Sequence, residues 1–348
     1  MWRIINFIHR FGLIELFLIS FVLVNALTFL LCYLDKRRAI QNRYRISEKT
    51  LIFFTVALGG LGALFGMYLL KHKTRKTQFK LTVAIGVIIA IIPVIHVVHG
   101  LTLDRIIQYV EIDFHAENWP AELDGYRIAF MTDFHTITDE DMAAVVRKLN
   151  GRSIDLLLLG GDFSADVFQG GNHYRGTIRE ISRAVTTDGI FGVEGNHDYY
   201  PQLFAAKEYY GIGILDNNGS QIRNGFSLVG VRDLWFGQAN VEQALSDIDT
   251  DDFVLMVTHN PDVSMSQSSP DIDLYFAGHS HGGQITFFGF PMYLLLGSVS
   301  DYGLRFAHGF NYSAHGVPVF TSRGVGSYYN WPRIFARPEV VIFTMYSK

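Results

Sequence analysis

Residues with metal-binding side chains stand directly after apolar stretches of this sequence. Two of them, His279 and His281, alternate in the glycine-rich run GHSHGGQ at residues 278–284. Carboxylate and amide oxygens and imidazole nitrogens, without a thiolate, suit Mn, Fe or Zn and disfavour a structural zinc finger. These residues are Asp133, His135, Asp162, Asn196 with the adjacent His197 and Asp198, His259, His279 and His281, and seven of them are candidate ligands.

The size of this set predicts two divalent metal ions. Seven ligands exceed what one ion takes, and they suit two ions that share a carboxylate. Such a pair neutralises the oxygens of a phosphate group and lowers the pKa of a bound water towards about 7, which makes that water a nucleophile. The alternation in HSH lets one histidine face each ion. We therefore expect a hydrolase that acts on phosphoester or phosphoanhydride bonds.

The elements that must position these ligands are short buried strands that alternate with helices. Helical spacing is found at residues 140–150 and at about 174–187. Apolar strands that alternate with helices predict α/β layers, and ligands of such sheets gather beyond the carboxyl ends of the strands. The expected strands are YRIAFMTD (126–133), IDLLLLGGD (154–162), GIFGVEGNHD (189–198), FVLMVTHNP (253–261) and DLYFAGHSH (273–281).

The charge distribution divides the chain. Residues 1–100 hold 13 Lys and Arg against 3 Asp and Glu, whereas residues 101–348 hold 16 against 30. A basic, apolar third joined to an acidic remainder indicates a membrane domain followed by a water-soluble domain. The single cysteine, Cys32, excludes an intramolecular disulfide. We expect a membrane domain at 1–100, a linker and first strand at 101–125, and the catalytic domain at 126–348.

Three apolar segments are each close to the length of about 20 residues that a membrane span requires. They cover residues 11–33, 51–70 and 81–98, so we expect a multi-pass protein of the cell membrane whose partner is the lipid bilayer. The two loops between them carry six and five Lys and Arg. With three full spans these loops lie on opposite sides, and the positive-inside rule then decides nothing.

The middle segment leaves two arrangements open. Its glycines at 59, 60, 62 and 66 favour tight helix packing, but they also suit a re-entrant hairpin. In the re-entrant arrangement both basic loops are cytoplasmic, and the catalytic domain lies outside. We favour the outside location for this reason. His72, in the second loop, is expected to be a solvated interfacial residue.

The first 100 residues resemble a short bacterial membrane family of unknown function. The pieces that carry this resemblance are YLDKRRAI, YRISEKTL, LGGLGALFGM and HKTRKTQF. The resemblance implies a bacterial origin and no activity.

Residues 126–345 resemble a calcineurin-like metallophosphoesterase of the membrane-anchored bacterial type, whose last histidine motif reads GHxHGGQ. The resemblance implies a four-layer α/β/β/α sandwich. It also implies that His197 lies outside the metal ligands and faces the phosphate as a general acid, with Asp198 in place to orient it. The family often has DxHxG where this chain has DFHTI, with Ile137 in the glycine position. By motif, the first metal takes Asp133, His135 and His281, the second takes Asn196, His259 and His279, and Asp162 bridges the two.

The substrate is less defined by the sequence. The stretch ITFFGFPMYLLLG at residues 285–297 is either a packed strand or a hydrophobic lip for an acyl or isoprenoid chain. Some membrane-associated members of the family hydrolyse the pyrophosphate of UDP-diacylglucosamine, so a lipid-linked phosphate is expected. The lip residues are Phe287, Phe288, Phe290, Tyr293 and Leu294.

The sequence also bears on two other functions. Nucleic acid is not expected as a partner, because the soluble part is acidic and shows no cluster of Lys and Arg. The alternative to an enzyme is a membrane scaffold or sensor with a non-catalytic phosphoesterase-like domain. The intact ligand set favours the enzyme.

Overall fold

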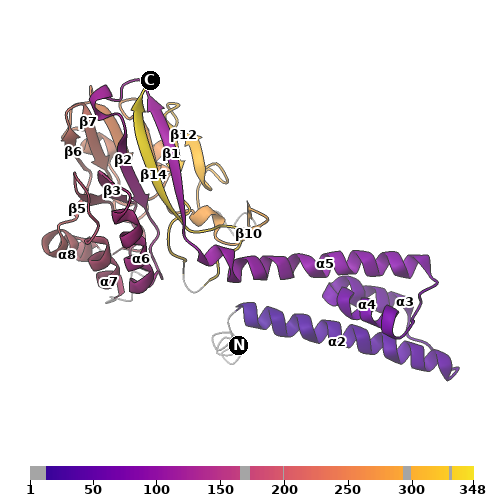
Figure 1. The fold of residues 1–348 in the computed structure, drawn as a ribbon. Helices are drawn as coiled ribbons and strands as arrows, with labels where there is room; N and C mark the ends of the chain where they lie inside the picture. The colour runs from indigo at the N-terminus through magenta and orange to yellow at the C-terminus, as the bar shows by residue number, and fades with distance from the viewer. Residues whose placement is uncertain (1–12, 165–172, 199, 293–298, 329–330) are drawn as a thin grey trace. The chain divides into compact units, whose positions relative to one another are not determined.

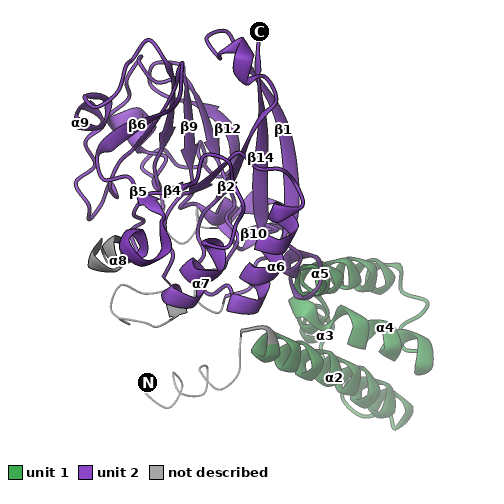
Figure 2. Cartoon of the chain, turned by 60° about the vertical axis from the view of Figure 1, so that its left-hand side comes forward, with its two compact units in different colours: residues 1–99 green, residues 100–348 purple. Residues whose placement is uncertain are grey.

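A computed structural model describes residues 13–164, 173–198, 200–292, 299–328 and 331–348. The chain forms two compact units, residues 1–99 and 100–348 (Figure 2). The residues expected as a linker and first strand belong to the second unit, where β1 (Gln108–Ala116) joins a sheet as its edge strand.

The second unit is built on two six-stranded sheets (Figure 1). Strands β2, β3, β4 and β5 run parallel in the first sheet, and β7, β8, β9 and β13 run parallel in the second. The first sheet has the order β1, β14 (Glu339–Ser347), β2 (Tyr126–Met131), β3 (Leu156–Leu159), β4 (Ile190–Gly192) and β5 (Gly213–Ile214). The second has the order β12 (Gly309–Tyr312), β13 (Pro318–Thr321), β9 (Leu274–Ala277), β8 (Phe253–Val257), β7 (Phe226–Gly230) and β6 (Asn218–Arg223).

Alternation of side chains along the strands creates the four layers. In β3, Leu157 and Leu159 pack towards the helices, whereas Leu156 and Leu158 pack between the two sheets. Strand β8 likewise divides its side chains between the inter-sheet core and an outer core. The expected four-layer α/β/β/α sandwich is confirmed.

Helices cover the outer face of each sheet. The first sheet packs against α6 (Asp139–Asn150), α7 (His173–Ile181) and α8 (Tyr200–Tyr210), and the second against the short helices α9 (Val241–Leu245) and α10 (Val263–Ser266). Helix α6 begins where the side chain of Thr138 accepts a hydrogen bond from the amide of Asp141, which is a favourable N-cap. The helix expected up to residue 187 ends earlier, at Ile181, because the chain turns back and Thr186 pairs with Ile154 as a β-bridge.

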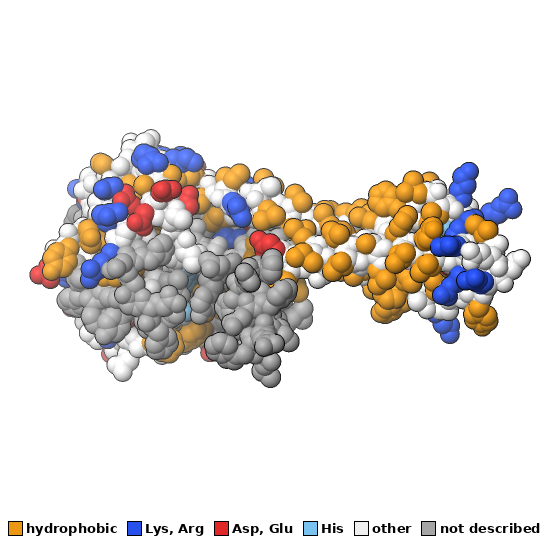
Figure 3. Space-filling view, turned by 90° about the horizontal axis from the view of Figure 1, so that it is seen from below, with side chains coloured by type: hydrophobic (Ala, Val, Ile, Leu, Met, Phe, Trp, Pro, Cys, Tyr) orange, Lys and Arg blue, Asp and Glu red, His pale blue; other side chains and the backbone are white. Residues whose placement is uncertain are grey.

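The described residues hold three helical segments that are long and apolar enough to span a membrane, namely Glu15–Ile40, Glu48–Leu69 and Thr77–Arg105. They correspond to α2 (Leu13–Ile40), to α3 (Glu48–Phe54) with α4 (Gly60–Leu69), and to α5 (Thr77–Leu101). Hydrophobic side chains cover these helices, and Lys and Arg gather at one end of this unit (Figure 3). These segments support association with a membrane.

The middle segment is broken and turns back on itself. Residues 55–59 form a π-helical stretch in which Ala57 and Leu58 leave the helical region, with φ of 67° at Leu58. The side-chain amide of Asn25 in α2 bonds both sides of the break. Its Nδ2 donates to the backbone carbonyl of Leu58 at 2.9 Å, and its Oδ1 accepts from the backbone amide of Gly62 at 2.8 Å. These bonds satisfy backbone groups that the break frees in apolar surroundings.

The two halves of the hairpin run in opposite directions along α2. Gly62 and Gly66 of α4 lie against Asn25 and Cys32, and a side chain on Gly62 would collide with the carbonyl oxygen of Asn25. Before the break, the amide of Ile46 bonds Asp35, close to the other end of α2. The glycines therefore serve both uses that the sequence left open: they permit close packing, and they do so within a hairpin.

A buried carboxylate holds the two basic loops at the same end of the unit. Asp35 accepts hydrogen bonds from Arg45 in the first loop at 2.5 Å and from His72 in the second at 2.7 Å. His72 is buried, so the expectation of a solvated histidine is wrong. A buried carboxylate requires donors, and these two loops supply them.

We expect Asn25→Leu to destabilise the first unit, because the change leaves two backbone groups of the helix break without partners. Each such loss costs about 1–3 kcal/mol. The measurement is thermal unfolding in detergent. Thr82→Val is the control, since the Thr82 hydroxyl bonds Gln78 within its own helix. Equal melting of the two variants would contradict a role of Asn25 in holding the hairpin.

Candidate metal centre

The seven expected ligands meet at the carboxyl ends of five strands, as the sequence predicts. Asp133 and His135 follow β2, Asp162 follows β3, and Asn196 follows β4, all in the first sheet. The second sheet contributes His259 after β8 and both His279 and His281 after β9. All seven side chains are buried.

The backbone at these strand ends is unusual. Five of the seven ligands have positive φ, a region that non-glycine residues rarely adopt, and such strain collects at functional sites. Close approach is also required beside Asp162, where a side chain on Gly195 would collide with the carboxylate. The five are Asp133 (55°), His135 (38°), Asp162 (57°), His279 (70°) and His281 (53°).

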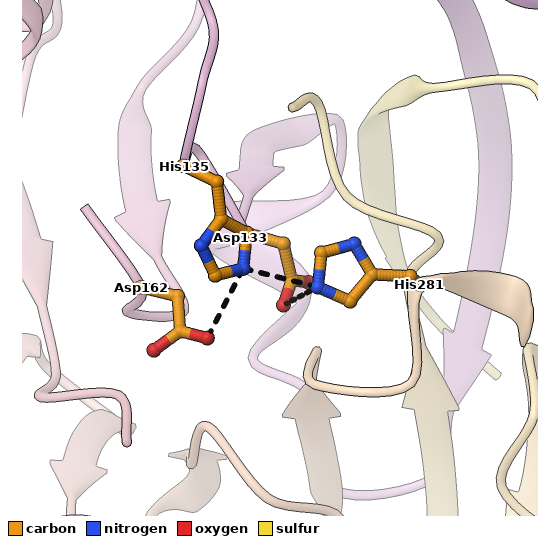
Figure 4. A group of neighbouring side chains, drawn as sticks. All are labelled: Asp133, His135, Asp162 and His281. Atoms are coloured by element: carbon orange, nitrogen blue, oxygen red, sulfur yellow. Dashed lines mark hydrogen bonds and ion pairs between the residues drawn. The ribbon is translucent and has the colours of Figure 1, made fainter. Parts of the chain in front are cut away.

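A first group of ligands joins Asp133, His135, Asp162 and His281, whose ligand atoms lie within 4.8 Å of one another (Figure 4). The Nε2 atoms of His135 and His281 are 3.0 Å apart. Nε2 of His281 lies 3.4 Å from Oδ1 of Asp133, and Nε2 of His135 lies 3.3 Å from Oδ2 of Asp162. Ligands about 2.0–2.2 Å from one ion lie roughly 3 Å from each other, so these spacings fit a metal.

A second group joins Asn196, His259 and His279. Oδ1 of Asn196 lies 3.0 Å from Nε2 of His259 and 2.9 Å from Nδ1 of His279, and these two nitrogens are 3.2 Å apart. Nε2 of His259 also lies 3.2 Å from Oδ2 of Asp162. The same carboxylate oxygen therefore contacts both groups.

In three of the imidazole rings, the nitrogen that points away from the ligand group donates a hydrogen bond to a backbone carbonyl. This bond fixes the ring so that its other nitrogen faces the ligand group. Nδ1 of His135 donates to the carbonyl of Ser164 at 2.9 Å, and Nδ1 of His259 donates to that of Gly160 at 2.7 Å. Nε2 of His279 donates to the carbonyl of Val299 at 3.0 Å. Lone pairs and carboxylate oxygens that converge at about 3 Å repel one another unless a metal ion or a proton lies between them. The donor set thus fits a divalent metal, as expected.

The electrostatics of the site agree with this fit. Burial and the neighbouring His259 lower the pKa of His279 to about 3, so that ring is neutral at physiological pH. Burial raises the pKa of Asp162, but the adjacent His259 and His135 outweigh burial and hold it well below its usual range. Burial lowers the pKa of His259, but the Asp162 carboxylate outweighs it and raises the pKa to about 10. Metal ions and protons therefore compete for Nε2 of His259.

His197 and Asp198 occupy different places. The His197 ring lies beside the first ligand group, with its centroid 5.2 Å from that of His135 and 5.0 Å from that of Tyr328. The carboxylate of Asp198 accepts from the backbone amides of Asp162 and Phe163 at 2.7 Å and of Gly195 at 2.8 Å. These bonds tie the turn after β3 to the turn after β4, whereas the sequence suggested that Asp198 orients His197.

A pocket of about 280 Å³ opens over the ligands. Its floor includes Asp162 and His197, and its walls are mainly apolar, with Trp235, Tyr328 and Trp331 among them. Ile285 and Met292 of the expected lip segment line the pocket. Phe287, Phe288 and Phe290 are not among the lining residues, and Tyr293 and Leu294 lie outside the described residues.

Some residues of the site were missed by the sequence analysis. The Trp235 ring packs edge-on against His279 at 4.6 Å, and Asp233 holds this turn by accepting from the amides of Trp235 and Phe236. Asp233 follows β7, so the pattern of polar residues at strand ends also marks it. Arg333 is buried behind His281 and donates to the carbonyl oxygen of His281 at 3.2 Å. No motif indicated Arg333.

Comparison with known proteins adds to this picture. Residues 126–283 match the family described as calcineurin-like phosphoesterase, and residues 25–79 match a protein family of unknown function, DUF1294. Phosphodiesterase YaeI of Escherichia coli is 31% identical over 242 residues, which cover 63% of this chain and 82% of that protein. The uncharacterized metallophosphoesterase YkuE of Bacillus subtilis is 27% identical over 247 residues, which cover 66% of this chain and 82% of that protein.

The fold, the ligand set and these relatives define the class: the chain belongs to the calcineurin-like metallophosphoesterases. A further relative is described as a transmembrane protein with a metallophosphoesterase domain, from Danio rerio. It is 25% identical over 318 residues, which cover 83% of this chain and 69% of that protein. The N-terminal match and the apolar helices fit a membrane domain of unknown function.

We expect Asp162→Ala to lose more bound metal than Asn196→Ala, because Asp162 contacts both ligand groups and Asn196 only the second. The measurement is elemental analysis of the purified full-length protein. Asp113→Ala serves as the control, since Asp113 is an exposed residue of β1. Retention of all metal by the Asp162 variant would show that its carboxylate is not a ligand.

Proposed function

We propose that this protein hydrolyses a phosphate ester or anhydride with a water molecule activated between two divalent ions. The observation that carries the proposal is the shared oxygen of Asp162, which lies 3.3 Å from His135 and 3.2 Å from His259. A bridging carboxylate between two nitrogen-rich groups is the arrangement that a binuclear site requires. A scaffold or sensor would not need two complete ligand sets. This supports the enzyme over the non-catalytic alternative.

The ions would neutralise the phosphate oxygens and lower the pKa of the attacking water. Residues 133, 135, 162 and 281 would hold one ion, and residues 162, 196, 259 and 279 the other. The histidines bonded to backbone carbonyls keep fixed ring orientations, so the site is organised before the substrate arrives.

His197 is proposed to donate a proton to the leaving oxygen. It lines the pocket beside the ligands, and its backbone amide donates to Oδ1 of Asp162 at 2.8 Å, which fixes its position relative to the shared carboxylate. A side chain there reaches a substrate without being a ligand. Asp198 contributes by holding the two turns that carry Asp162 and His197.

We expect His197→Ala to keep its metal and to lose rate, by about 10²–10⁴-fold for substrates with poor leaving groups. Nitrophenyl esters, whose leaving group needs no proton, should lose much less. The measurement is the ratio of kcat for an alkyl and a nitrophenyl ester in the two proteins. Equal losses for both esters would contradict an acid role.

The substrate is proposed to be a lipid-linked phosphate, for which a UDP-diacylglucosamine type of molecule is one candidate. The pocket walls are mainly apolar, and no Lys or Arg is among the described residues that line it. Such walls suit an acyl or isoprenoid chain better than a second anionic group. The apolar segment that the sequence singled out supplies Ile285 and Met292 to these walls.

The catalytic unit is proposed to lie outside the cytoplasm. Asp35 holds both basic loops at one end of the first unit, and these loops carry eleven Lys and Arg at residues 36–49 and 71–80. The positive-inside rule then places this end in the cytoplasm. Because α5 starts at that end and crosses to the other, the chain that follows it lies outside.

Single cysteines in a Cys32→Ala background test this topology. We expect Arg43→Cys and Arg75→Cys, one in each loop, to react with an impermeant thiol reagent only after the membrane is opened. Val185→Cys, in the catalytic unit, should react in intact cells. Opposite accessibility of the two loops would rule out the hairpin arrangement.

A further inference from the structure

A small aromatic hairpin projects from the second unit beside the metal pocket. It consists of β10 (Thr286–Phe287) and β11 (Phe290–Pro291), with Gly289 at positive φ in the turn. Its phenylalanines are about half exposed, at 49% for Phe287, 52% for Phe288 and 53% for Phe290. A cluster of exposed aromatic side chains usually marks a contact surface.

The hairpin is attached to the segment that receives the end of α5. The amide of Thr286 donates to the carbonyl of Ile334 at 3.0 Å, and Phe288 packs on Phe335 with ring centroids 5.3 Å apart. The amide of Phe335 in turn donates to Asp104 at 2.7 Å. A side chain on Gly100, at the end of α5, would meet the carbonyl of Arg333 at 2.9 Å.

One short segment, residues 333–335, thus contacts both the hairpin and the residues at the end of α5. Next to that helix end, further apolar side chains are exposed. We call the combined surface the apolar collar. It consists of Leu101, Leu103, Ile106, Phe287, Phe288 and Phe290.

We propose that the apolar collar docks on the lipid bilayer, with the phenylalanines of the hairpin inserted at the level of the headgroups. The chain enters the collar directly from α5, so the bilayer surface is the nearest apolar phase to it. Aromatic side chains are favoured at membrane interfaces. Arg105 is exposed beside Leu103 and Ile106, and Arg337 donates to the carbonyl of Ile106 at 3.3 Å, so cations are available for anionic headgroups.

Docking would give the three phenylalanines a role different from substrate binding. The three phenylalanines do not line the pocket, whereas Ile285 and Met292, the residues that flank the two strands of the hairpin, do line it. This inference rests on the proposed function. The arrangement would let the phosphate group of a lipid-linked substrate reach the metal ligands while the acyl or isoprenoid chain of that substrate stays in the membrane. The hairpin would thereby join the bilayer to the pocket.

The first test measures lipid contact without using activity. Full-length protein with Cys32→Ala carries a fluorophore on Phe288→Cys in nanodiscs that contain lipids brominated near the headgroup. The control is Val185→Cys, and Val185 is 70% exposed. It lies beside Thr186, which pairs with Ile154 ahead of β3, so it is near the ends of the strands opposite to the ligands. We expect strong quenching at position 288 and little at 185. Equal quenching, or shielding of position 288 from both lipid and aqueous quenchers, would overturn docking.

The second test measures the consequence for turnover. We expect Phe287→Ser with Phe288→Ser to lower hydrolysis of a long-chain lipid phosphate in nanodiscs by about tenfold, the equivalent of about 1.4 kcal/mol. Hydrolysis of a small soluble ester should stay unchanged, and the melting temperature should fall only slightly, through the lost contact between Phe288 and Phe335. A parallel fall of both rates and of the melting temperature would show that the hairpin is structural and overturn the proposal. If the unaltered protein cleaves only the soluble ester, the lipid substrate fails while the quenching result still decides docking.

Discussion

The shared carboxylate oxygen of Asp162 is the point on which both ligand groups of the candidate metal centre depend. Ligands from the first sheet and from the second meet at this one buried atom. A carboxylate that is buried without partners loses its hydration and gains nothing in return. Neighbouring donors or cations must therefore replace the lost water around Asp162. Asp198 accepts from its backbone amide, and the amide of His197 donates to its other oxygen. The surroundings of this one side chain are therefore supplied by both sheets.

Most of this centre could be predicted from the sequence because a buried strand and a ligand require opposite residue types. The change from apolar to polar residues falls within three residues of each strand end, and it marks Asp133, Asp162 and His259 as candidates. The run FSLVGV shows the same change and leads to Asp233, whose turn carries Trp235. Arg333 follows no such run. It is held by the carbonyl of Gly326, seven residues away, and by that of His281, 52 residues away, which is a contact that a linear pattern cannot indicate.

The first unit shows where a sequence pattern is ambiguous for physical reasons. Glycines permit close helix packing in a straight span and in a broken one, so their spacing does not distinguish the two. The polar side chains of the helices do distinguish them: Asn25 bonds both sides of the break, and Asp35 bonds both loops. Each is conspicuous in an apolar helix, but its partners lie in other segments of the chain. Only the folded unit shows that Asn25 and Asp35 stabilise a hairpin.

The position of β14 has a consequence for the order of events during synthesis. This strand, Glu339–Ser347, lies between β1 and β2 in the first sheet, and β1 pairs with it along its whole length. Every expected metal ligand precedes it in the chain. Until the ribosome has released these residues, β1 has no neighbour in its sheet and β2 lacks one side, so the ligands cannot yet be held in their final places. The apolar helices emerge first and can enter the bilayer before the catalytic sheets close. Metal would then be acquired only after insertion, from whichever compartment receives the finished domain.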